Sequence, residues 1–148
     1  MKATQLSPEA LDTIADEHES LANLYKRIVD ALQAGPGELS PASAMLDELV
    51  ERVAEHFAHE EQGGYYFHVV EVAPWRTPAV EELKREHAEL LRITVRIAQG
   101  VRMANESLLW CEAVRKEFSE FLRRCMEHEA RENRLVQETY MVDLAAAD

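Results

Sequence analysis

Glycine and proline are scarce in this 148-residue chain, with five of each. They gather at a few positions and leave four long segments between them, none of which alternates apolar and polar residues as a half-buried strand does. The scarcity of turn residues and of strand patterns predicts an all-α protein.

Cysteine and long apolar runs are also nearly absent. Two cysteines do not make a disulfide framework, which favours a reducing, cytoplasmic location. No stretch approaches the roughly 18 consecutive apolar residues of a membrane span, and the first residues lack the apolar centre of a signal peptide. We therefore expect a cytoplasmic protein with no membrane partner.

Positive charge is the third shortage. The chain has 16 Lys and Arg against 28 Asp and Glu, a net charge of −12. Nucleic acid and anionic membrane surfaces would repel such a chain, so neither is an expected partner. The length and the 47% hydrophobic content suit one domain, 1–148, with a core of its own.

The four segments carry helix start signals and amphipathic stripes. Three begin with a capping residue followed by proline, at Ser7-Pro8, Ser40-Pro41 and Thr77-Pro78, and the fourth begins near Asn105 or Ser107. Apolar residues recur in steps of three and four along each segment, as on the inward side of a bundle helix. The pattern predicts an antiparallel up-down-up-down four-helix bundle.

The second segment contains the least regular stretch. Its stripe is expected to continue through Gly63, Phe67 and Val70 to Pro74. Each glycine in a helix costs about 1 kcal/mol relative to alanine. The pair Gly63-Gly64 therefore predicts a bend or an early helix end there, with room beside a functional site as the alternative.

Histidine and glutamate recur on these stripes in a duplicated order. The first segment carries His18, and the second carries the pair His56 and Glu60, four residues apart. The third carries a single histidine and the fourth a pair with the same spacing: His87, then His128 and Glu132. Residues four apart share one helix face. The order therefore predicts a pseudo-twofold bundle whose two halves contribute equally to one site.

Six such groups on core stripes are costly unless they share a partner, and a metal is the simplest partner. Imidazole and carboxylate ligands without a set of thiolates suit iron, manganese or zinc. Six ligands exceed what one tetrahedral zinc takes. They suit two octahedral metals, each with two histidines, that share two bridging carboxylates and leave a position for a small molecule.

The chain resembles the hemerythrin-like (HHE cation-binding) proteins over about residues 8–140. The resemblance rests on the four-helix order of these six residues and on strings such as His-Phe-Ala-His-Glu-Glu at 56–61. It implies two iron ions with oxo or hydroxo bridges, and manganese or zinc as possible substitutes. It also implies that Glu60 and Glu132 bridge the irons and that the four histidines are terminal ligands.

The chain departs from the oxygen-carrying members at two positions. Those proteins have a fifth histidine one turn after the third-helix histidine, where this chain has Leu91. Their last carboxylate follows its histidine by five residues, a place that Asn133 takes here. The ligand set is closer to the di-iron domain of iron–sulfur cluster repair proteins, whose extra Cys-containing N-terminal domain this chain lacks.

The expected function is therefore binding of, or reaction with, O2, peroxide or NO in sensing, scavenging or a stress response. A di-iron oxidase or peroxidase, and a module for iron storage or delivery, are the alternatives. A pocket near Gly63-Gly64 wider than a diatomic molecule would favour the enzyme. Whether the chain is catalytic, and how many copies assemble, stay open.

Other residues near the stripes have simpler expected roles. His59 and His68 are expected at or near the surface rather than as ligands. Cys125 is expected to pack. The acidic residues beside the ligands but off the stripes, such as Glu17 and Glu61, are expected to solvate the helices. Four aromatic residues are expected to pack, the first in the core with a possible bond to a bound oxygen species, the others around the connection of the second and third segments: Tyr25, Tyr65, Tyr66 and Trp75.

Overall fold

The computed structural model describes residues 8–35, 37, 39–62, 65–103 and 108–147. Within these ranges the chain is helical and contains no strand, which confirms the all-α prediction. The elements are α1 (Pro8–Gln33), α2 (Leu39–Gln62), α3 (Tyr65–Val72), the 3-10 helix η2 (Pro74–Arg76), α4 (Thr77–Met103) and α5 (Leu108–Ala147).

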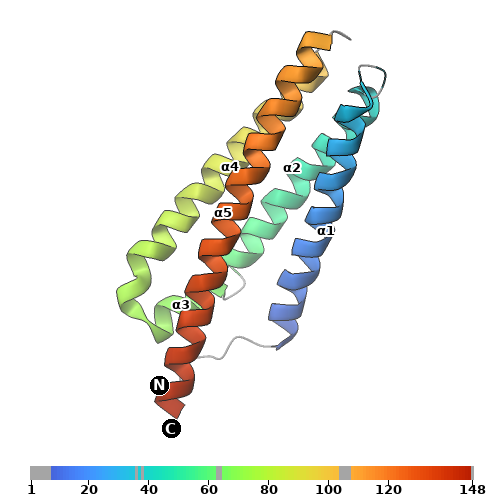
Figure 1. Cartoon of the computed structure of the whole chain (residues 1–148). Helices are drawn as coiled ribbons and strands as arrows, with labels where there is room; N and C mark the ends of the chain where they lie inside the picture. The colour runs from blue at the N-terminus through green and yellow to red at the C-terminus, as the bar shows by residue number, and fades with distance from the viewer. Residues whose placement is uncertain (1–7, 36, 38, 63–64, 104–107, 148) are drawn as a thin grey trace.

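The four long helices lie side by side as a bundle (Figure 1). α1 meets α2 at the upper end of the view, and α4 meets α5 at the same end. The short elements α3 and η2 connect α2 to α4 at the opposite end. The C-terminal part of α5 extends beyond the other long helices at that end.

The buried residues form two separate clusters along the bundle. The larger one occupies the upper end and includes Leu24, Leu49, Ile97 and Phe118. The smaller one joins α3 to the lower parts of α1, α4 and α5 and includes Tyr66. On α1, α4 and α5, the positions predicted as ligands fall between residues of these two clusters, whereas on α2 they follow residues of the larger cluster and precede the end of the helix at Gln62. The apolar packing therefore fixes the level at which the polar side chains meet.

Two local features explain where helices end and begin. Gly35 follows α1 with φ of +105°, a left-handed conformation that glycine adopts without steric cost. At the start of α4, the Thr77 hydroxyl donates to the Pro74 carbonyl at 2.7 Å, which holds η2 against the first turn of α4.

The single stripe predicted for the second segment was wrong, but the early helix end predicted within that segment is confirmed. α2 ends at Gln62 and a separate helix begins at Tyr65, so the register of inward positions changes. Phe67 is 62% exposed, whereas Tyr66 and Val69 are buried in its place. Gly63-Gly64 lie outside the described residues, as do Ser7 and the predicted start at Asn105 or Ser107.

One smaller difference concerns the start of α2. α2 begins at Leu39 rather than at the Ser40-Pro41 start signal, which falls inside its first turn. None of the described helices combines the length and the apolarity that a membrane crossing requires.

Candidate metal centre

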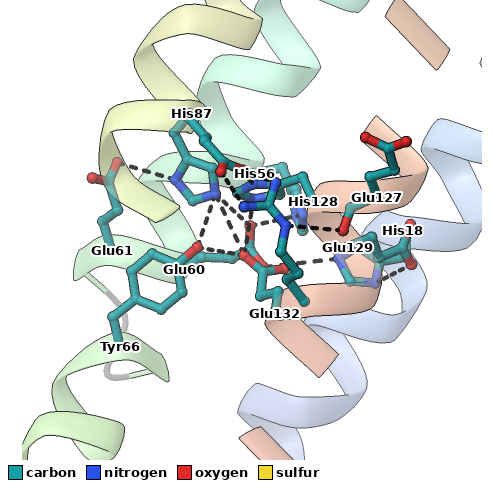
Figure 2. Close-up of polar contacts among 12 residues, drawn as sticks. His18, His56, Glu60, Glu61, Tyr66, His87, Glu127, His128, Glu129 and Glu132 are labelled. Atoms are coloured by element: carbon teal, nitrogen blue, oxygen red, sulfur yellow. Dashed lines mark hydrogen bonds and ion pairs between the residues drawn. The ribbon is translucent and has the colours of Figure 1, made fainter. Parts of the chain in front are cut away.

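All six predicted ligands meet at one level of the bundle (Figure 2). α1 supplies His18, α2 supplies His56 and Glu60, α4 supplies His87, and α5 supplies His128 and Glu132. The structure thus brings together every residue that the sequence pattern selected as a ligand.

The six residues form two groups of three, each close enough together to hold a metal ion. His18, His56 and Glu60 make the first triad, and His87, His128 and Glu132 make the second triad; within each, one potential ligand atom per residue lies within 4.8 Å of the others. In the first triad, His56 Nε2 is 3.1 Å and His18 Nε2 is 3.9 Å from the Glu60 carboxylate.

The second triad is built in the same way. Nε2 of His87 and of His128 lie 3.4 and 3.3 Å from Glu132 Oε2. Glu60 also reaches across, because its Oε1 is 3.4 Å from His87 Nε2. A carboxylate of the first triad is therefore within reach of an imidazole of the second.

The centre is buried, and several of its polar atoms have no hydrogen-bond partner. Glu60 is fully buried and Glu132 is 1% exposed. Both Glu60 oxygens and His128 Nε2 lack a hydrogen bond, as do Nδ1 of His56 and of His87. Buried carboxylates and imidazoles without partners are costly, and bound cations satisfy such atoms. These donors fit metal ions of the kind that the ligand chemistry selects.

Electrostatics favour the ionised forms of Glu60 and His87. Burial alone would raise the pKa of Glu60, but the imidazoles of His18, His56 and His87 hold it well below its ordinary value. Burial alone would lower the pKa of His87, but Glu132 and Glu60 raise it to about 9. Carboxylates and imidazoles at these distances favour each other's ionised forms.

A second set of carboxylates surrounds the four histidines. We call Glu17, Glu61, Glu86 and Glu129 the outer carboxylates. The His128 Nδ1–H donates to Glu86 Oε2 at 2.8 Å, and His18 Nδ1 lies 3.2 Å from Glu129 Oε1.

The other two contacts are longer. His56 Nδ1 is 3.7 Å from Glu17 Oε1, and His87 Nδ1 is 3.6 Å from Glu61 Oε2. The expectation that Glu17 and Glu61 only solvate their helices was wrong, because each faces a histidine on a neighbouring helix. Every ligand histidine thus turns Nε2 toward Glu60 or Glu132 and Nδ1 toward an outer carboxylate. A carboxylate at the second ring nitrogen fixes the orientation and tautomer of a metal-binding histidine.

Two outer carboxylates are themselves held by a basic side chain. Arg131 donates through both terminal nitrogens to Glu86. Burial alone would raise the pKa of Glu86, but Arg131 and His128 hold it below its ordinary value. His59 Nδ1 lies 2.9 Å from Glu17 Oε2. His59 and Arg131 each follow a ligand histidine by three residues, so the duplication extends to this layer with a different residue in each half.

Tyr66 is a site residue that the sequence analysis missed. Its hydroxyl donates a short hydrogen bond to Glu132 Oε2, and the Tyr66 hydroxyl oxygen is 3.0 Å from His87 Nε2. The hydroxyl is buried, which together with the charges of Glu132 and Glu60 raises the pKa of Tyr66 far above its usual value. Tyr66 therefore closes the side of the centre that faces α3. The signal was a tyrosine shortly after Glu60, but its orientation depends on the break between α2 and α3.

A cavity of about 260 Å³ opens on the opposite side of the centre, between α1 and α5. Five of the six ligands line its floor, all except His87. Its walls are mostly apolar: Leu21, Tyr25, Phe57, Leu90, Leu122, Cys125 and Met126. Phe57 stacks on the His87 ring at a centroid distance of 3.9 Å and separates that histidine from the cavity. A space wider than a diatomic molecule needs therefore exists at the site, on the α1–α5 side. The pocket predicted near Gly63-Gly64 falls outside the described residues.

Of the remaining predictions, some are confirmed and others were wrong. His59 lies at the surface outside both triads, but His68 is buried on α3, so its surface placement was wrong. Tyr65 packs as expected, whereas Trp75 is 64% exposed. Cys125 lies in the cavity wall, and burial raises the pKa of its thiol to about 12.

Comparison with protein-family models gives an independent result. The hemerythrin HHE cation-binding domain model matches residues 9–140. The chain belongs to this family, whose domain binds metal cations, and the candidate ligands lie within the matched region. Searches among curated proteins and among solved structures found no significant match.

Proposed function

We propose that the chain holds two metal ions, most simply iron, one in each triad, with Glu60 and Glu132 bridging them. The observation that carries the proposal is the set of buried and unpaired ligand atoms, above all both Glu60 oxygens and His128 Nε2. Two cations would satisfy these atoms and neutralise the buried carboxylates. Manganese and zinc are the substitutes that the same donors would accept.

The proposal includes the symmetry of the bundle. We interpret the fold as an antiparallel up-down-up-down bundle with an internal pseudo-twofold duplication, α1–α2 and α4–α5 being the repeated units. Each unit would supply two histidines to one ion and one carboxylate to both. The two triads and the equivalent places of Glu17 and Glu86 before the single histidines support this interpretation.

We further propose that the centre binds or reacts with O2, peroxide or NO in the cytoplasm. Two bound iron ions would supply electrons and a binding position to such molecules. At the position where oxygen carriers have a fifth histidine, this chain has Leu91. The Leu91 side chain is partly buried and packs against the larger core cluster. The four-histidine set would leave more open coordination than a five-histidine one.

The chain's own residues would shape that reaction. The apolar walls formed by Leu21, Leu90 and Leu122 would keep bulk water from the floor of the cavity. On the other side, the Tyr66 hydroxyl would hold Glu132 and His87 in position as ligands, because it donates to Glu132 Oε2 and lies 3.0 Å from His87 Nε2. The outer carboxylates would keep the four imidazoles in the orientation that points Nε2 at the metals.

The first experiment is metal analysis with an absorption spectrum of protein purified from iron-supplied cells, recorded after reduction and after exposure to O2 or NO. We expect two irons per chain and a spectrum that changes on exposure. One zinc per chain, or no metal, would remove the proposed function and leave the bundle unaffected.

An oxidase or peroxidase activity is the second candidate. The observation that favours it is the cavity of about 260 Å³, which is far larger than a diatomic molecule needs. Iron-dependent oxidation of an added organic donor by peroxide would support this candidate. Peroxide consumption that no organic donor accelerates would favour simple scavenging.

A further inference from the structure

The cavity between α1 and α5 extends well beyond the candidate ligands. We propose that it is a binding site for an uncharged aromatic molecule of about the size of one substituted ring, held directly above the metal centre. This inference names a substrate class for the proposed function and rests on it only for the consequence of binding, since the cavity is present without metal.

The size of the cavity sets the size of the ligand. An apolar cavity of about 150 Å³ is enough to take up benzene. The cavity here is about 260 Å³, and its floor is shared with the metal ligands. A single substituted ring is therefore the ligand size that we propose for this space.

The chemistry of the walls favours an aromatic ligand over an aliphatic one. Tyr25 and Phe57 offer ring edges and faces, and Cys125 and Met126 offer sulfur. Aromatic rings pack favourably against both kinds of side chain. The Tyr25 hydroxyl, next to the Cys125 thiol, provides one polar group that can orient a hydroxyl or ring N–H of the ligand.

Charge excludes acids from the same space. Glu129 stands at the mouth and is about half exposed, and the carboxylates of Glu60 and Glu132 lie at the floor. The chain carries a net charge of −12. A carboxylate or phosphate ligand would meet repulsion on entry and an apolar wall once inside.

The mouth is open because small or flexible residues stand there. Ala22 on α1 is exposed, and Met126 on α5 is 72% exposed. α1 and α5 are also the least closely packed of the neighbouring long helices. A ligand can therefore enter without unfolding of the bundle, past a methyl group and a mobile thioether.

The test is a titration of the metal-free and the iron-loaded protein with indole and with p-cresol, followed by calorimetry or NMR. We expect saturable binding of one molecule per chain to both forms, and a change in the iron absorption of the loaded form. Benzoate serves as the charged probe of the metal-free protein, in which no cation offsets the carboxylates, and should bind at least about tenfold more weakly than p-cresol, a difference of about 1.4 kcal/mol.

Ala22→Phe fills the mouth and should weaken indole binding by at least about tenfold. Asn23→Phe is the matched control, because residue 23 is the exposed neighbour on α1 that does not line the cavity, and it should bind indole as the parent does. Both variants are first checked for unchanged helicity and metal content.

The outcomes separate this inference from the proposed function. Two irons per chain without saturable indole or p-cresol binding would overturn the ligand site and leave the metal centre intact. If the protein takes up no metal but still binds indole, the ligand site is supported and the proposed function fails. Equal binding by parent and Ala22→Phe would place the ligand elsewhere and overturn the inference, and equal binding of benzoate would overturn its charge argument.

Discussion

The two triads have the same ligands at the same spacing but differ in their surroundings. The first triad lies beneath the cavity, and its His18 side chain is 18% exposed. In the second triad, His128 and Glu132 also line the cavity, but Phe57 separates His87 from it, and Tyr66 and the Glu86–Arg131 pair cover the other sides. The His87 side chain is 2% exposed. A duplicated ligand set therefore need not give two metal sites with the same surroundings. We expect the first triad to meet incoming molecules and the second to hold its metal more tightly.

The largest effect is expected from removing a ligand of each triad, with His56→Ala and His128→Ala as the matched pair. Each should lose metal affinity by more than about 100-fold, above the range for an outer partner. Each should also lower the melting temperature of the iron-loaded protein, because binding free energy is partly folding free energy.

The comparison predicts a greater loss for His128→Ala, which also leaves Glu86 and Arg131 beside an empty space. Metal analysis and thermal unfolding measure both variants. Unchanged iron content in either variant would refute the ligand assignment, and a greater loss in His56→Ala would reverse the ranking of the triads.

The outer carboxylates should have the next largest effect. Glu86→Gln should weaken metal binding by about 10- to 100-fold, because it replaces the charged acceptor that orients His128 with a neutral amide. Glu17→Gln should cost less, since its distance from His56 Nδ1 is already 3.7 Å. Competition with a chelator measures both affinities. Glu81→Gln, an exposed substitution on the same helix as Glu86, is the control and should match the parent.

Tyr66→Phe tests what closes the second triad. It removes the donor to Glu132 and should lower the free energy of unfolding of the metal-free protein by about 1 to 3 kcal/mol, the cost of a buried acceptor without its partner. Denaturant unfolding measures the change. Tyr65→Phe removes the hydroxyl of the adjacent buried ring and controls for the loss of a hydroxyl alone. Equal effects of the two substitutions would show that the bond to Glu132 contributes nothing of its own.

The smallest effect is expected at His59, the counterpart of Arg131. His59→Ala should keep two metals per chain, because His59 lies outside both triads. His59→Arg makes the two halves alike and should raise metal affinity at the first triad by at most about fivefold, the scale of an exposed ion pair of 1 kcal/mol or less. Metal analysis and chelator competition measure the pair, and a fall to one metal in His59→Ala would show that the ligand list is incomplete.

Sequence periodicity predicted the all-helical fold and the positions that meet at the centre. Helical spacing fixes which residues share a face, so His56 and Glu60 could be placed on one stripe without knowledge of the neighbouring helices. The apolar residues on both sides of each ligand then set its depth.

The contacts between helices could not be predicted in the same way. Glu17 and Glu61 read as ordinary surface acids, because their partners lie on other helices and no local pattern marks them. Phe67 and His68 were misplaced, and the contact of Tyr66 with Glu132 was missed, for a different reason. Their orientation depends on where α2 ends and α3 begins, and a change of register there turns Tyr66 and His68 inward and Phe67 outward.

The outer carboxylates also bear on how the bundle assembles. Glu17 joins α1 to α2, Glu61 joins α2 to α4, Glu86 joins α4 to α5, and Glu129 joins α5 back to α1. The last contact joins residues that are far apart in the chain. Closing so long a loop has the largest entropic cost of the four, so we expect this contact to form last. A folding intermediate with any one helix undocked would therefore lack two of the four contacts. High-affinity metal binding would then mark chains that have completed folding and would pass over those that have not.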